Sequence, residues 1–204
     1  MKKIFTVLCA AVFVLALSTG ALAGPYVGVQ VGASMPVANN TSSNVAGISN
    51  PGFQSNVAAG VQVGYDWLGN KTYPNLKYFS VAVDYMYNGL FVNNALTRTT
   101  GAQNTLALIG AAKYPMYISK EYPNGRVFPY VGVGPTLNFT SLNSANATNI
   151  GFLVEPGLKF YVTKKISTDV AYRFNFTQVN LNDGNNTKFD NSNNIALVRV
   201  NYNF

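Results

Sequence analysis

Eight charged side chains recur within otherwise apolar stretches of this 204-residue sequence, and their types could do chemistry. Four are carboxylates and four are cations: Asp66, Asp84, Glu155, Asp169, Lys113, Lys159, Arg173 and Arg199. Carboxylates of this kind can act as general acids or bases, and beside cations they can gate an ion or proton path. The chain has no histidine, which removes the usual base for a serine nucleophile and the commonest metal ligand. We therefore expect a structural charge network, with no catalytic residue, metal or cofactor.

These charges lie on segments in which apolar and polar residues alternate, the pattern of a strand with two different faces. In the last segment Ala196, Val198, Val200, Tyr202 and Phe204 fall on one side. Segments of about ten alternating residues separated by turns are typical of transmembrane β-barrels. The eight that we identify are residues 26–34, 53–67, 78–88, 104–117, 127–140, 150–162, 166–178 and 195–204.

After residue 23 no stretch approaches 18 apolar residues, the length of a helix that spans a membrane. In lipid every backbone polar group must be paired within the protein, which leaves a closed barrel as the spanning structure. The sequence therefore predicts an all-β fold, an eight-stranded antiparallel transmembrane β-barrel with an up-and-down meander. The connections rich in Asn, Ser, Thr and Gly are expected outside: residues 35–52, 89–103, 141–149 and 179–193.

The apolar parity of each segment carries more aromatic rings than the interior of an eight-stranded barrel can hold. The other parity carries many glycines together with the eight charges. We therefore expect the apolar face to meet lipid and the charges to fill a narrow lumen. A soluble carrier barrel would place the apolar parity inside and is disfavoured by the size of these rings.

The turn at residues 163–165 fixes a register between two of the segments. Apolar residues stay on one face only if the loop has an odd number of residues, because a slip of one residue turns every side chain over. A three-residue loop sets Lys159 opposite Asp169 and Glu155 opposite Arg173. We therefore predict two cross-strand ion pairs in the lumen.

Two further expectations concern closure and strain. The last segment should pair with the first, so that the sheet has no free edge. Pro129, Pro135 and Pro156 lie inside predicted strands, where proline cannot donate a ladder hydrogen bond. We expect bulges or local bends at these three positions.

The first 23 residues have the features of a secretory signal peptide. Lys2 and Lys3 precede a short apolar run over residues 4–17, and Ala21-Leu22-Ala23 forms an A-x-A cleavage site. Cleavage leaves residues 24–204 as one barrel domain without cysteine, because Cys9 is removed. Cleavage also lowers the net charge from +7 to +5. The remaining basic residues form no patch with interleaved aromatics, so we expect no nucleic-acid partner. We interpret the lysines in the turns as solvated side chains beside anionic head groups.

Three short motifs resemble a known group. They are Gly24-Pro25-Tyr26-Val27-Gly28-Val29, Phe128-Pro129-Tyr130-Val131-Gly132-Val133-Gly134, and Val198-Arg199-Val200-Asn201-Tyr202-Asn203-Phe204. They resemble the small outer-membrane β-barrel proteins of the OmpA/OmpX and opacity-protein type. The resemblance implies export through the periplasm to the bacterial outer membrane. It also implies that Tyr202 and Phe204 form the signal read by the outer-membrane assembly machinery.

The leading functional hypothesis is a non-enzymatic, monomeric barrel with a structural or surface-interaction role. Such a role includes membrane integrity, adhesion, or contact with host or other surface ligands through the outer connections. The expected partners are outer-membrane lipids, lipopolysaccharide and the assembly machinery. Two alternatives remain: a small channel with porin-like permeability through the polar lumen, and an outer-leaflet lipid-modifying enzyme, which the absence of histidine disfavours.

Overall fold

The computed structural model describes residues 24–42, 52–53, 55–68, 74–93, 98–142, 145–180 and 188–204. The predicted signal peptide, residues 1–23, lies outside the described residues. Almost every described residue belongs to a strand, as the alternating pattern predicts. The elements are β1 (Gly24–Ser42), β2 (Gly52–Phe53), β3 (Asn56–Asp66), the short 3₁₀ helix η1 (Pro74–Tyr78), β4 (Phe79–Asn93), β5 (Arg98–Lys113), β6 (Val127–Leu142), β7 (Ala145–Tyr161), β8 (Ile166–Asn180) and β9 (Lys188–Asn203).

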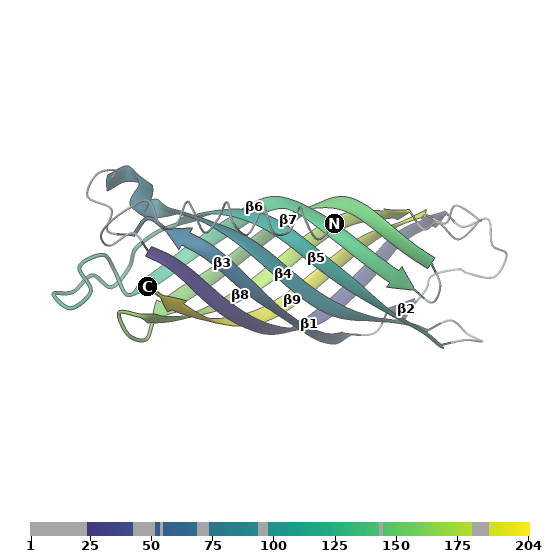
Figure 1. The fold of residues 1–204 in the computed structure, drawn as a ribbon, viewed down its shortest axis with the longest axis horizontal. Helices are drawn as coiled ribbons and strands as arrows, with labels where there is room; N and C mark the ends of the chain where they lie inside the picture. Colours follow the sequence, from purple (N-terminus) through teal and green to yellow (C-terminus); the bar gives the residue numbers. More distant parts are fainter. Residues whose placement is uncertain are drawn as a thin grey trace.

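Eight long strands close into an antiparallel meander barrel (Figure 1). Their order around the ring is β1, β3, β4, β5, β6, β7, β8 and β9, and the two-residue β2 adds to β4. The seam is the pairing of β1 with β9, in which Val29 lies opposite Val200. The predicted fold class is therefore confirmed, including the pairing of the first strand with the last. No helix in the described part of the chain is long and apolar enough to cross a membrane.

The strands run further than the sequence predicts at the end opposite the start of β1. β1 continues to Ser42, β4 to Asn93, and β5 begins at Arg98, although residues 35–52 and 89–103 were predicted to be connections. The reason is that ladder hydrogen bonds join backbone groups and do not need alternating side chains. At the other end, residues 114–117 were predicted to be strand but lie beyond β5, where Met116 forms an isolated bridge with Val127.

The three prolines are accommodated without any shift in register. The β6–β7 ladder runs unbroken through Pro129 and Pro135. Pairing lapses only on one side of two prolines: β5 and β6 lose it beside Pro135, and β7 and β8 lose it beside Pro156, with the same register on either side. The expectation of bulges is therefore wrong, and the alternative, a local bend at these prolines, stays a prediction. A missing N–H removes local hydrogen bonds to one neighbour without adding a residue to the strand.

Side chains divide by parity between the outer surface and the lumen. Outward residues are apolar and exposed, such as Val29 at 62% and Val57 at 64%. On β6 the outward apolar series ends at Phe139, and Ser141 follows it. A spanning strand needs roughly 9–11 residues, and β6 has 16. The barrel wall therefore projects beyond its apolar belt, at the end opposite the start of β1.

Candidate functional site: a charge network across the lumen

All eight sequence-predicted charges point into the barrel and are buried, each at most 7% exposed. They come from six of the eight long strands: β3, β4, β5, β7, β8 and β9. Each occupies the parity opposite to the lipid-facing residues, because successive side chains on a strand point to opposite faces. Four positive and four negative groups give a lumen with no formal net charge. Mutual neutralisation is what a buried set of charges requires.

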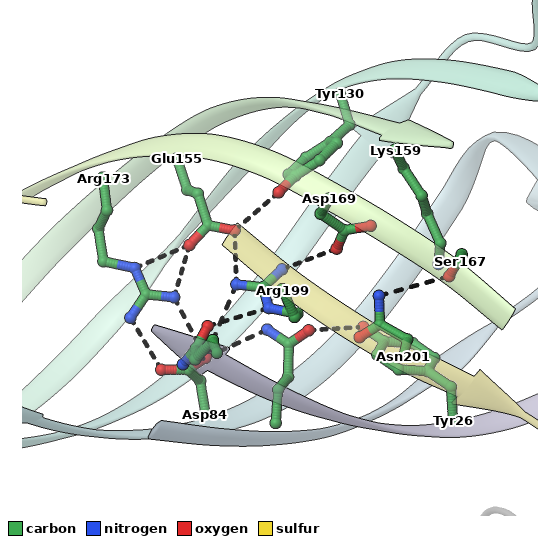
Figure 2. A network of polar contacts seen from close by, with 12 residues as sticks. Tyr26, Asp84, Tyr130, Glu155, Lys159, Ser167, Asp169, Arg173, Arg199 and Asn201 are labelled. Carbon is green, nitrogen blue, oxygen red and sulfur yellow. Dashed lines mark hydrogen bonds and ion pairs between the residues drawn. The ribbon is translucent and has the colours of Figure 1, made fainter. Parts of the chain in front are cut away.

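Arg173 on β8 binds two carboxylates from two other strands (Figure 2). Its guanidinium donates to Asp84 at 2.8 and 3.2 Å and to Glu155 at 2.5 and 2.7 Å. Asp84 lies on β4, four places from β8 around the ring, so this contact joins opposite walls. The planar fork of arginine suits two carboxylates at once, because its N–H groups point along its plane in several directions.

A second arginine, Arg199 on β9, links Glu155 to Asp169. It donates to Glu155 and Asp169, each at 3.0 Å, and to the Gln30 side-chain oxygen at 3.0 Å. Gln30 in turn donates to Asp84 at 2.7 Å. Figure 2 shows Arg199 among these groups in the middle of the lumen. The two arginines and three carboxylates therefore form one connected cluster.

The other cluster lies nearer the end at which β1 starts. Asp66, the last residue of β3, binds Lys113 of β5 and accepts a 3.4 Å contact from Lys159 of β7. β3 and β7 are opposite walls of the ring, so Lys159 also crosses the lumen. The Lys159 ammonium lies 4.7 Å from the centre of the Tyr26 ring, a cation–π distance. The lumen is thus bridged at two levels.

The register predicted from the 163–165 turn is correct, and one of its two ion pairs forms. Lys159 lies opposite Asp169 in the ladder, and Glu155 binds Arg173. The predicted Lys159–Asp169 ion pair is wrong, because Lys159 binds Asp66 and Asp169 binds Arg199. Asp169 is also a ladder neighbour of Arg199 on β9, a competing partner that a two-strand register does not include.

An uncharged polar layer fills the outer part of the lumen, and sequence reasoning did not identify it. Asn138 accepts from Thr105 at 2.8 Å and from Asn175 at 2.9 Å, and donates to Thr177 at 2.7 Å. All four are buried. The alternation in the sequence does place these residues on the inward face. It does not predict which of them bond to one another, because amide and hydroxyl groups can pair with many different partners.

A small cavity lies inside the network. A cavity of about 30 Å³ lies between the two clusters, bordered by Tyr130, Glu155, Asp169 and Arg199. That is room for roughly two water molecules. One oxygen of Asp169 is buried without a protein partner, so water is the natural occupant. Within the described ranges no group of three or more acidic, histidine or cysteine side chains is arranged to hold a metal.

Tyr202 and Phe204, the predicted assembly signal, lie on the outer face of the seam. They are 42% and 73% exposed, and their rings meet edge to face at 5.1 Å. Their outward position leaves them accessible, and their role in assembly stays a prediction.

Comparison with known proteins places this geometry in context. The family model described as outer membrane protein beta-barrel domain matches residues 5–204. Neisserial surface protein A is 19% identical with a TM-score of 0.61, covering 88% of this chain and 97% of its own. OprG of Pseudomonas aeruginosa is 16% identical with a TM-score of 0.60, covering 91% and 98%. Outer membrane protein W of E. coli is 14% identical with a TM-score of 0.51, covering 91% and 100%. No curated protein sequence matches the chain. At these identities the solved structures establish a shared fold.

Proposed function

Because the chain belongs to the outer membrane protein beta-barrel domain family and lies in the bacterial outer membrane, we propose that it serves there as a closed, non-enzymatic, monomeric barrel. Its role is structural or one of surface interaction. The observation that carries the proposal is the ion pair of Arg173 with Asp84, which joins opposite walls of the lumen. A long side chain fixed across the middle of a barrel occupies the path that a solute would follow.

Two further observations support a plugged lumen over a channel. Lys159 makes a second crossing to Asp66, at a level closer to the start of β1. The cavity between the two crossings is about 30 Å³, far below a continuous water path. Eight-stranded barrels have interiors that side chains can just fill, whereas open porins have 16 to 18 strands.

The same contacts argue against catalysis in the lumen. Each of its four carboxylates binds a lysine or an arginine, and the chain supplies no histidine. A general base needs access to a substrate proton, and each of these carboxylates is buried and neutralised by a cation. A structural role, in which the eight charges fill the lumen and neutralise one another, explains these residues without a catalytic reaction.

The outer part of the wall is where a surface role would reside. Beyond the apolar belt the outward residues become polar, as at Ser141, Asn146 and Thr148 on β6 and β7. Polar strands on a rigid base suit contact with lipopolysaccharide or with host and other surface ligands. Within the described residues each of the eight long strands pairs on both sides, so none of them offers an edge to another copy, which supports a monomer.

Conductance separates the proposal from the channel alternative. The purified protein is reconstituted into planar bilayers and compared with protein-free bilayers and with a porin of 16 strands. We expect no current steps above the protein-free baseline, while the porin produces them. Reproducible steps of one size from the folded protein would establish a channel and overturn the proposal.

A further inference from the structure

The turns at the end of the barrel where β1 starts hold an excess of positive charge. The lumen network is neutral, yet residues 24–204 carry a net charge of +5 once Lys2 and Lys3 are set aside. Among the described turns at this end, the exposed or half-buried charged residues are five cations and one anion: Lys77, Lys120, Arg126, Lys164, Lys165 and Glu121. This rim is therefore strongly basic, and it adjoins the membrane surface.

A hollow of about 450 Å³ opens within the basic rim, in the size range of small-molecule sites. It lies between the β5–β6 connection, the β7–β8 turn and the end of β9, which Figure 1 shows together at one end of the barrel. Lys120 and Lys164 border it from two different turns, and the lining also includes the acidic Glu121 and Asp66 and the polar Tyr122 and Asn203. Two cations from separate turns converge on a single space.

The hollow is preformed, because the β5–β6 connection has its own hydrogen bonds. The amides of Ser119 and Gly125 both donate to the Tyr122 carbonyl, at 3.2 and 3.0 Å. Gly125 has a φ of 102°, which favours glycine, and an added Cβ would lie 2.9 Å from Pro115. Arg126 donates to the Tyr161 carbonyl at 3.3 Å and so ties the connection to the barrel rim.

One edge of the hollow is continuous with the lipid-facing surface. Phe204 borders it, is 73% exposed, and belongs to the same outward row as Tyr202 and Val200. The rest of the lining is largely polar and includes Lys120, Lys164 and Asn203. An occupant that matches this lining has an apolar part in the bilayer beside Phe204 and an anionic part at the lysines.

We propose that this hollow binds the head group of an anionic phospholipid from the membrane leaflet on this side. The phosphate lies between Lys120 and Lys164, the hydroxyls of a glycerol head group meet Asn203, and the acyl chains pass Phe204. A basic segment beside the bilayer attracts anionic lipid, and two exposed lysines from separate turns beside one hollow favour it over zwitterionic lipid. The inference is independent of whether the lumen conducts.

Native mass spectrometry of the protein in micelles tests the site, with phosphatidylglycerol and phosphatidylethanolamine supplied in titrations. We expect the unmodified protein to bind phosphatidylglycerol at least about tenfold more tightly than phosphatidylethanolamine. Lys120→Gln with Lys164→Gln should weaken phosphatidylglycerol binding by about tenfold to thirtyfold. Lys77→Gln with Lys165→Gln is the matched control, since it removes the same charge at the same end but outside the hollow, and it should change the affinity less than about threefold.

Each other result overturns the proposal. An unmodified protein without preference for phosphatidylglycerol excludes the site, whatever the variants do. Equal weakening in both double variants means attraction to the whole basic rim, with no defined site. If soluble glycerol phosphate displaces phosphatidylglycerol and binds with equal affinity, the hollow is a site for free phosphate and not for a lipid. Gel mobility of unboiled samples verifies that each variant is folded, and the single variants Lys120→Gln and Lys164→Gln replace the double variant if it does not fold.

Discussion

Arg173 on β8 and Asp84 on β4 join opposite walls of the barrel through hydrogen bonds of 2.8 and 3.2 Å. The exposed fractions of the two residues are 1% and 0%. Arg173 also binds Glu155, so one guanidinium contacts carboxylates on two other strands, β4 and β7. The contact fills the lumen and at the same time connects strands that are far apart around the ring. Its removal should therefore affect both stability and permeability.

Arg173→Ala should lower the free energy of unfolding by about 3–5 kcal/mol, because it leaves Asp84 and Glu155 buried with too few partners. Urea unfolding of the refolded barrel in detergent micelles measures the change. Lys165→Ala is the control, since an exposed turn lysine should alter stability by less than about 0.5 kcal/mol. An unfolding midpoint for Arg173→Ala equal to that of the unmodified protein would contradict the assigned ion pairs.

Replacing both side chains that cross the lumen should open a leak. Lys159→Ala with Arg173→Ala removes the two crossings at different levels, and we expect current steps in planar bilayers where the unmodified protein gives none. Lys164→Ala with Lys165→Ala keeps the lumen intact and removes the same charge outside, so it should stay silent. Silence of the crossing variant in its folded form would mean that other side chains close the lumen.

Gly134→Ala should destabilise the barrel by about 1–3 kcal/mol, as overpacking does. An added Cβ would lie 1.8 Å from the Leu108 carbonyl oxygen, which is backbone and cannot move aside without opening β5 from β6. Gly110→Ala is the matched control on β5, because its nearest atom lies at 4.0 Å. Thermal unfolding of both variants compares them, and equal melting temperatures would show that β5 and β6 do not approach so closely.

Phe204→Ser should reduce the amount of protein assembled in the outer membrane and leave refolding in detergent intact. The reason is that Phe204 is 73% exposed, so its loss removes little buried surface, and its proposed role lies in recognition during assembly. Phe79→Ser removes another exposed, outward aromatic from the same end and serves as the control. Membrane fractionation with immunoblotting measures the yield. Equal yields for the two variants would exclude a special role for Phe204.

The sequence predicts well the part of the barrel that lies within its apolar belt. The physical reason is the alternation of apolar and polar residues along each strand. Where one face meets lipid, alternation fixes both the strand and its orientation, as in Val198 outward and Arg199 inward. It predicts the strand ends opposite the start of β1 poorly, because β1 continues to Ser42 through a sequence in which apolar and polar residue types do not alternate. There the pairing partner alone extends the strand.

In the charge network, contacts between neighbouring strands are likewise predictable from the sequence, whereas contacts across the lumen are not. A two-strand register correctly places Glu155 opposite Arg173, since both lie beside one short turn. The contact of Arg173 with Asp84 depends on barrel closure and on the stagger of eight strands, neither of which a local pattern contains. The same closure brings Lys159 to Asp66 and so overrides its ladder neighbour Asp169.

The coupling energy between Asp84 and Arg173 measures directly whether these two side chains bridge the lumen. Asp84→Asn, Arg173→Gln and the double variant are unfolded in urea, and the cycle isolates the interaction of the two side chains. We expect a coupling of about 1–3 kcal/mol, because the partners are buried and meet at 2.8 Å. Effects that add to within about 0.5 kcal/mol would contradict a bridge between the opposite walls of the barrel.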